Sequence, residues 1–282
     1  MNTYYKHITI IIITYNSNNE VIKFITKIPK IFQVVIVDNS NDISLRSKFK
    51  NNKNIKLYFH KNNGFGTSLN FAVRKTKTQY FFQVSPDLKF NFRQLEIFYN
   101  EGKKLENKFS ALGPRFTNAD KKGHVQSSKK EKIGKIHAVH GSAMYISKKV
   151  FNKIGGIDEN IFLYFEENDY CLRGRKLGLK AYQINKTYIK KKGQTVKFKK
   201  KNEKIELLKL LSWHYIWSEF YFHKKNKGYF FAIIYFCPLL IRTIFKFLLN
   251  RLLRNNNNLV KYKYRLKGLL SSMMNQKSYL RL

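Results

Sequence analysis

An unbroken run of β-branched residues, Ile8 to Ile13, constrains the fold of this chain most strongly. Such runs are typical of a strand that is buried on both faces, as in a parallel sheet. The run stops at Asn16 to Asn18, and a second run, Val34 to Val37, ends at Asp38. The residues between the two runs, Val21 to Ile28, can form a helix. The order strand, helix, strand predicts a parallel α/β sheet.

Two further strands continue this alternation. Ile55 to Phe59 leads into the loop Asn62 to Gly66, a helix is expected from about Thr67 to Lys75, and Tyr80 to Val84 ends at Ser85-Pro86-Asp87. In open parallel sheets, ligands bind outside the carboxyl ends of the strands. The polar residues at these strand exits are therefore the first candidates for a ligand site.

The strand exits bring together Thr14 to Asn16, Asp38 and Asp87. The Asp38 carboxylate could accept hydrogen bonds from a ribose or a base. The Asp87 carboxylate could hold Mg²⁺ or Mn²⁺ against a diphosphate, because these cations prefer oxygen ligands. Aspartate after a strand is also ordinary turn chemistry, and one carboxylate makes an incomplete metal site.

The loop Gly64-Phe65-Gly66 opens a helix after a strand, so its backbone amides could approach a phosphate. The spacing imitates a dinucleotide-binding fingerprint, but Leu69 occupies the position of the third glycine. A structural turn is the alternative interpretation of the same residues.

An acidic cluster, Glu166-Glu167-Asn168-Asp169, stands out in a chain with 17 acidic and 55 basic residues. Asp169 and Arg173 are four residues apart and could simply pair on a helix, while the two glutamates could favour its dipole. The functional alternative is a general base, a carboxylate that takes the proton of an attacking hydroxyl group.

The remaining pattern predicts further elements and a surface loop. These are a helix from Asn91 to Leu105, a strand at Ala111 to Leu112, a polar surface loop from Thr117 to Lys135, structure again from Ala138 to Ile146, a helix near Lys148 to Ile154, a turn at Gly155-Gly156, and a helix from Glu166 that Gly178 ends.

A change of character near residue 200 predicts two domains, an α/β domain over 1–200 and a helical, basic extension over 201–282. Trp213, Trp217, Phe220 and Tyr221 lie at helical spacing, as in a packed helix or a sugar-stacking platform. The apolar run Tyr229 to Ile241 is shorter than the roughly 20 residues that span a bilayer, so no transmembrane helix is expected.

The net charge of +38 means that the surface attracts anions. Arg242, Lys246 and Arg254 recur in steps of four or eight after Pro238, as in a basic helix that lies in a membrane interface. An anionic membrane surface is therefore an expected partner. Two distant cysteines and no signal-peptide pattern favour a cytoplasmic protein, peripheral on the inner face of the membrane.

Taken together, several short segments resemble the family 2 glycosyltransferases, and more narrowly the rhamnosyltransferase-like subgroup that extends bacterial surface polysaccharides. The resemblance spans about residues 7–195 and includes Ile11 to Asn16, Val35 to Ser40, Asn63 to Gly66 with Asn70, Ser85-Pro86-Asp87, Gly141-Ser142, Gly155 to Asp158, and Tyr164 to Asp169.

This resemblance implies a GT-A fold, a mostly parallel central sheet flanked by helices with a Rossmann-like nucleotide-binding half. It implies an inverting transfer of a sugar, of which rhamnose is one candidate, from a nucleotide-diphosphate donor to a glycan or lipid-linked acceptor. Glu167 aligns with the catalytic base, with Glu166 and Asp169 beside it, and Asp87 with the metal-binding acid. The implied donor-binding residues are Thr14, Tyr15, Asn16, Asp38, Asn63, Gly64, Gly66, Asn70, Asp87 and Lys190.

The chain departs from the family pattern at two positions. Family members usually carry aspartate where Glu167 stands, and often histidine where Lys190 stands. A protonated lysine cannot ligate a divalent metal, so Lys190 is expected to neutralise the diphosphate directly and to weaken the need for Mg²⁺ or Mn²⁺.

Two rival functions remain open at this point. A catalytically inactive relative would explain the changes at Glu167 and Lys190. A basic RNA-binding protein would explain the charge and the interleaved aromatic residues, but it gives no reason for carboxylates at several strand exits, so no nucleic-acid partner is expected.

Overall fold

The computed structural model describes residues 3–40, 43–117, 126–191 and 201–281. By its internal contacts the chain divides into two compact units. Met1–Asp158 and Glu166–Lys197 form one, here named the sheet unit, and Glu159–Phe165 with Phe198–Leu282 form the other, here named the helical unit. Residues 159–165 thus group with the helical unit although they precede residue 200.

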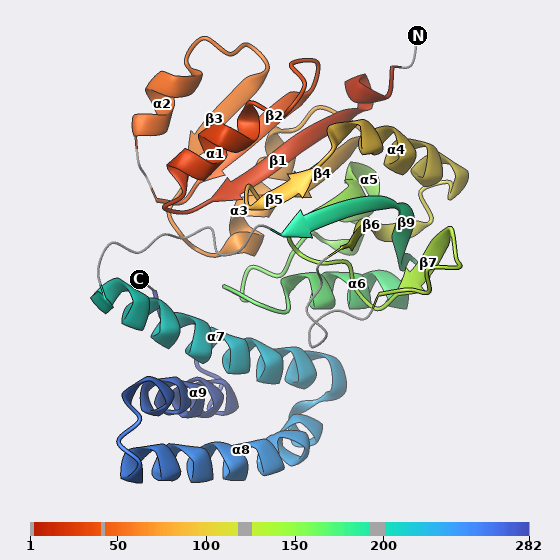
Figure 1. The fold of residues 1–282 in the computed structure, drawn as a ribbon. Coiled ribbons are helices and arrows are strands. Elements are labelled where there is room, and N and C mark those ends of the chain that lie inside the picture. Colours follow the sequence, from red (N-terminus) through yellow and green to blue (C-terminus); the bar gives the residue numbers. More distant parts are fainter. Residues whose placement is uncertain (1–2, 41–42, 118–125, 192–200, 282) are drawn as a thin grey trace. The chain divides into compact units, whose positions relative to one another are not determined.

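The sheet unit is built on a nine-stranded sheet, in the order β3-β2-β1-β4-β8-β6-β9-β5, with β7 paired to β9 (Figure 1). The strands are β1 (Ile8–Thr14), β2 (Gln33–Asp38), β3 (Ile55–Phe59), β4 (Tyr80–Val84), β5 (Leu88–Phe90), β6 (Phe109–Phe116), β7 (Ile133–Ile136), β8 (Ala143–Ser147) and β9 (Lys180–Lys191).

The first four strands pair in parallel, as the sequence predicts, with β1 between β2 and β4. The later strands add antiparallel pairs: β8 lies between β4 and β6, and β9 accepts β5 and β7 antiparallel beside its parallel partner β6. The sheet is therefore mixed, and the α/β fold class is confirmed.

Helices cover both faces of this sheet. They are α1 (Asn18–Ile25), α2 (Ser44–Phe49), α3 (Phe65–Lys75), α4 (Leu95–Lys104), α5 (Lys148–Ile154) and α6 (Glu166–Lys176), with short 3₁₀ turns at Tyr4–His7 and Phe92–Gln94. One buried cluster joins β1 to α1, α2 and α4, and a second joins it to α3, α5 and α6.

The alternation of side chains along β1 explains the two clusters. Ile10 packs in the same cluster as Phe24 of α1, whereas the next residue, Ile11, packs in the same cluster as Leu69 of α3. Successive side chains of a strand point to opposite faces, and here both faces are covered. This is why the strand needs an unbroken apolar run.

The surface loop predicted over Thr117 to Lys135 is wrong in part. Residues 118–125 lie outside the described residues, but Ile133–Ile136 forms β7, antiparallel to Ala181–Ile184 of β9. This pairing joins segments almost fifty residues apart, and a four-residue strand carries too little periodicity to be recognised locally. For the same reason the short strand β5 was not predicted.

The helical unit consists of α7 (Lys201–Lys227), α8 (Tyr229–Leu252) and α9 (Asn256–Met273). Its core joins Phe220 of α7, Phe236 of α8 and Leu269 of α9. Gly268 lets α9 approach α7 closely, because a Cβ atom there would lie 2.4 Å from the Trp213 carbonyl oxygen.

The expectation that the apolar run after Tyr229 is too short to cross a membrane is wrong. The helix continues through Pro238 to Leu252, so the missing amide of Pro238 does not end it. Among the described residues, α8 is the one helix that is long and apolar enough for a membrane span, and 17% of its most apolar window is buried.

Candidate active site

The carboxyl ends of β1, β2 and β4 form the edge at which the predicted donor residues gather. Thr14 and Asp38 are direct partners across the β1–β2 pair. Asp87 follows the end of β4, which is the neighbour of β1 on the other side. All three side chains are buried. Parallel pairing therefore places residues 14, 38 and 87 at one edge of the sheet.

Asp38 and Thr14 also hold the turns that follow their strands. The Asp38 carboxylate accepts the Ser40 hydroxyl at 2.7 and 2.9 Å and the Ser40 amide at 3.2 Å. The Thr14 and Ser17 hydroxyls share a hydrogen bond of 2.7 Å. Between them lie the half-buried Tyr15 and the exposed Asn16, whose φ of 47° is in the left-handed region. The turn is thus fixed by polar groups before any ligand binds.

The glycine-rich loop before α3 serves close packing. Gly64 has a φ of 106°, and a Cβ atom at Gly66 would lie 2.6 Å from Ile157 Cγ2. The Asn70 side chain donates to the Ile157 carbonyl oxygen and accepts from the Ile157 amide, both at 2.9 Å. Gly66 and Asn70 therefore clamp α3 to residue 157, while Asn63 is exposed at the start of the loop. Donor binding by these residues stays a prediction.

Asp169 forms an ion pair with Arg173, as the structural interpretation of the acidic cluster predicted. Arg173 Nε donates to Asp169 at 2.7 Å, and its two terminal nitrogens donate to the carbonyl oxygens of Ile154 and Gly156 at 2.6 Å. The Asp169 side chain has no solvent exposure. Asp169 thus positions Arg173, which closes the glycine turn against α6.

Glu167, the predicted base, lies in the first turn of α6 and is half-buried. Burial raises the pKa of Glu167 above its ordinary value of 4.5, against backbone hydrogen bonds from Glu167 itself and from Gly141, which lower it. A Cβ atom at Gly141 would lie 3.3 Å from the Glu167 carboxyl group, so the two residues are in close contact. Its neighbour Glu166 is buried.

The turn at Gly141-Ser142 connects the two candidate acids. Gly141 contacts Glu167, and the Ser142 carbonyl oxygen accepts the Ser85 amide at 2.9 Å, two residues before Asp87. The His140 ring shares a hydrogen bond of 2.8 Å with the Ser142 hydroxyl, which holds the turn. The family resemblance included Gly141-Ser142 but predicted no specific role for this turn, which lies just before β8.

Two strained residues precede α6. Tyr164 and Phe165 have φ values of 69° and 70°. Bulky residues rarely adopt this left-handed conformation, and such strain gathers at functional sites. The backbone directly before α6 is therefore held in a conformation that costs energy, two residues from Glu167.

Lys190 lies on β9 next to the strand that follows Asp87. Lys89 and Lys190 are direct partners in the β5–β9 pair, and Leu88 is the partner of Lys191. Both Lys89 and Lys190 are exposed. The family segment continues through residues 192–195, which lie outside the described residues.

The described residues contain no group of three or more histidine, cysteine, aspartate or glutamate side chains that could hold a metal ion. Asp87 is one hard oxygen ligand, and the neighbouring strand pair contributes lysines rather than further oxygen ligands. Within the described part of the chain, these oxygen ligands do not by themselves complete a metal site.

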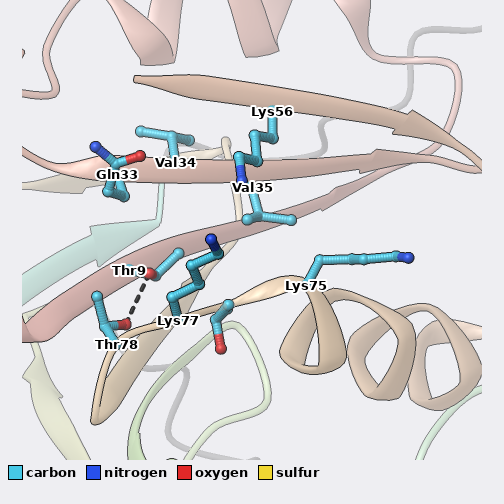
Figure 2. Close-up of a pocket in the computed structure, with 9 residues that line it drawn as sticks. Thr9, Gln33, Val34, Val35, Lys56, Lys75, Lys77 and Thr78 are labelled. Carbon is cyan, nitrogen blue, oxygen red and sulfur yellow. Dashed lines mark hydrogen bonds between the residues drawn. The ribbon is translucent and has the colours of Figure 1, made fainter. Parts of the chain in front are cut away.

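A separate cavity of about 110 Å³ lies at the opposite ends of the strands (Figure 2). Thr9 at the start of β1 and Thr78 before β4 share a hydrogen bond of 2.7 Å there. Lys56 and Lys77 line it, while Lys75 extends away from the threonine pair. It is small and lies away from Asp38 and Asp87, so it is not the predicted donor site.

Solved structures share this fold. A mannosyltransferase from Pyrobaculum calidifontis, in complex with GDP-Man and Mn²⁺, aligns over 96% of this chain and 86% of its own, with a TM-score of 0.55 and 14% identity. Residues 1–349 of TarS from S. aureus, in complex with UDP-GlcNAc, align over 97% and 93%, with a TM-score of 0.52 and 15% identity. The protein is thus an α/β protein of the GT-A class.

The sequence assigns the family within this class. Residues 9–158, more than half of the chain, match Glycosyl transferase family 2. The chain therefore belongs to the family 2 glycosyltransferases, and the resemblance seen in its motifs is confirmed at the level of family and fold.

Curated relatives match part of the chain. The low-salt glycan biosynthesis hexosyltransferase Agl10 of Haloferax volcanii is 25% identical over 191 residues, which are 60% of this chain and 62% of the relative. The dTDP-rhamnosyl transferase RfbF of Shigella flexneri is 25% identical over 173 residues, 54% of this chain and 56% of the relative. The matches thus cover less than two thirds of these relatives.

The raised pKa of Glu167 predicts how stability changes with pH. The folded protein binds this proton more tightly than the unfolded chain, so the residue lowers stability as the pH rises from 4.5 through its folded pKa. Glu167→Gln keeps an oxygen that can accept from Gly141 and removes the titration. We expect its unfolding free energy, measured by urea denaturation, to exceed that of the wild type increasingly across this range. A variant that is less stable at neutral pH would contradict burial as the dominant cause.

Proposed function

We propose that this protein is an inverting glycosyltransferase that moves a sugar from a nucleotide-diphosphate donor to a hydroxyl group of an acceptor. The observation that carries the proposal is the turn Gly141-Ser142, which contacts the Glu167 carboxylate on one side and the exit of β4, with Asp87, on the other. A base and a donor-binding edge are thus linked within one family 2 fold.

The reaction that fits this arrangement is a single displacement. The Glu167 carboxylate takes the proton of the acceptor hydroxyl group, and that oxygen attacks the anomeric carbon of the donor sugar. The bond between this carbon and the diphosphate oxygen breaks, and its electron pair leaves with the nucleoside diphosphate. A pKa above the ordinary value makes Glu167 a stronger base, provided that it is ionised when the acceptor binds.

The donor sugar and the acceptor are proposals at a finer level. Rhamnose is favoured by the sequence subgroup and by the relative named as a dTDP-rhamnosyl transferase. A glycan or lipid-linked acceptor in bacterial surface polysaccharide synthesis is favoured by the same subgroup. GDP-Man and UDP-GlcNAc are bound in two of the structural neighbours, so a donor panel should include sugars of GDP, UDP and dTDP.

A donor panel tests the proposal directly. We expect the purified protein to release nucleoside diphosphate from one member of a panel of sugar nucleotides in the presence of an acceptor extract. Glu167→Gln and Asp87→Ala should each lower kcat by about 10²- to 10⁴-fold, since each removes a group from the reacting centre. Glu106→Gln, a change of an exposed surface carboxylate, is the matched control. Equal turnover by Glu167→Gln and the wild type would show that Glu167 is not the base and would contradict the proposed mechanism.

Lys190 is proposed to neutralise the diphosphate in place of part of the metal's role. Its position beside β5, directly after Asp87, supports this assignment. We expect the wild type to keep measurable turnover in excess chelator and Lys190→Ala to lose it, with rescue by Mg²⁺ or Mn²⁺. Lys186→Ala, an exposed lysine on the same strand, should behave as the wild type. Complete and metal-reversible loss in both the wild type and Lys190→Ala would contradict the proposal.

Peripheral attachment to the cytoplasmic face of an anionic membrane is proposed from the helical unit. Its α8 exposes Phe230 by 83% and Ile234 by 74%, while Phe236 on another side of the helix packs against Phe220 of α7. A spanning α8 would draw the packed, lysine-bearing α7 into hydrocarbon, which is costly, so a position in the interface fits better.

Liposome flotation tests this attachment. We expect binding to vesicles that contain anionic lipid, with weaker binding to neutral ones, and loss of binding in Phe230→Asp/Ile234→Asp because two charges would enter the apolar face. Ile43→Asp, at a position 70% exposed in the sheet unit, is the matched control. Extraction at alkaline pH should release the protein. If the protein floats with neither kind of vesicle, the proposal of membrane attachment is wrong.

A further inference from the structure

The helical unit contains a cavity of about 370 Å³ that none of the predicted donor or base residues lines. Three segments of this unit form it: Glu159-Asn160, the second half of α7, and the chain after α9 from Asn275 to Arg281. We name it the cation pocket, because Lys224, Lys277 and Arg281 line it together.

The charges of the cation pocket are unbalanced. Three basic side chains face one carboxylate, Glu159. Lys224 Nζ donates to Asn275 Oδ1 at 2.8 Å and lies 5.4 Å from the Tyr221 ring centre. The Arg281 guanidinium lies 4.0 Å from the Phe162 ring centre and donates to its neighbour's carbonyl oxygen. Within the described part of the chain, neither cation has a carboxylate partner.

Burial acts on both of these cations. It lowers the pKa of Lys224 and that of Arg281, because each charge is partly removed from water. Lys224 is half-buried, whereas Lys277 and Arg281 are exposed at the rim. Cations that have no carboxylate partner among the described residues attract an incoming anion. The pocket therefore has the electrostatics of an anion site before any ligand arrives.

Hydrogen bonds fix the wall that carries Lys277 and Arg281. Trp217 Nε1 donates to the Gln276 carbonyl oxygen at 3.2 Å, and His214 Nε2 bonds the Leu280 carbonyl oxygen at 2.8 Å. The Trp213 and Tyr279 rings are 5.0 Å apart. A wall held in this way does not have to be ordered when a ligand binds, which favours affinity.

The other side of the cation pocket is aromatic and polar. Trp217 and Tyr221 stack at 5.1 Å with an angle of 12° between their rings, and Tyr221 is half-buried. The amide side chains of Asn160 and Gln276 add hydrogen-bonding groups. An apolar platform beside cations and amides suits a phosphate that is esterified to a sugar, a polyol or a lipid, more than a bare inorganic anion.

We propose that the cation pocket binds a phosphate group of the acceptor substrate. The assignment to the acceptor rests on the proposed function: Asn160 precedes Glu167, the base for the acceptor hydroxyl group, by only seven residues of chain. The phosphate belongs either to a lipid or to a soluble phosphate ester, since both present the same dianionic oxygens to lysine and arginine.

Two binding assays without any sugar nucleotide test the cation pocket. Glycerol 3-phosphate is titrated against the intrinsic fluorescence of Trp213 and Trp217, the two tryptophans of the chain. Flotation then compares phosphatidylcholine vesicles with and without phosphatidic acid. We expect Lys277→Gln/Arg281→Gln to weaken phosphate-dependent binding by roughly tenfold or more, because two charge-assisted contacts are lost.

Matched variants separate the pocket from general charge. Lys263→Gln/Lys267→Gln removes two exposed charges of α9 in the same unit and should bind as the wild type. Glu159→Gln removes the one carboxylate of the lining and should tighten binding severalfold, so its effect has the opposite sign. Circular dichroism melts of all variants establish that they are folded.

The outcomes are distinct. Saturable binding of glycerol 3-phosphate that the pocket variant weakens supports a soluble ester. Binding of phosphatidic acid vesicles alone, weakened by the same variant, supports a lipid phosphate. Equal behaviour of Lys277→Gln/Arg281→Gln and Lys263→Gln/Lys267→Gln in both assays overturns the proposal. The two binding assays contain no sugar nucleotide, so their outcome does not depend on catalysis. A donor panel without turnover would contradict the proposed function and would not affect the evidence for phosphate binding.

Discussion

The parallel pairing of β1 with β2 and β4 is the constraint on which the rest of the sheet unit depends. It buries Ile10 and Ile11 on opposite faces, so helices must cover both sides of the sheet. It also brings the ends of these strands to one edge, where Thr14 and Asp38 become neighbours. The polar residues of this edge are thus positioned by the core and not by a flexible loop.

Two glycines allow parts of the sheet unit to pack more closely than a residue with a side chain would. Gly141 allows Glu167 to approach its backbone, and Gly66 allows α3 to approach Ile157. Asn70 and Arg173 then hold the turn between α5 and α6 from two directions. Hydrogen bonds also tie the Gly141-Ser142 turn to Ser85 and to Glu167. Such pre-organisation is what the proposed proton transfer would require.

The helical unit combines a packed core with exposed apolar side chains and a basic pocket. Its core buries Phe220, Phe236 and Leu269, while α8 leaves large apolar side chains exposed. The same unit holds a pocket in which Lys224 and Arg281 lack carboxylate partners among the residues that the structure describes. Apolar exposure and unbalanced positive charge in one unit favour an amphiphilic, anionic partner such as a membrane or a phosphorylated acceptor.

The sequence by itself determined the first four strands, their parallel arrangement and the residues at their exits, because a strand that is buried on both faces requires an apolar run. The sequence motifs also predicted the family correctly. Only the tertiary structure decided the short strands β5 and β7 and the role of Asn70 in packing. Each of these depends on partners that are distant along the chain, and a local pattern does not contain them.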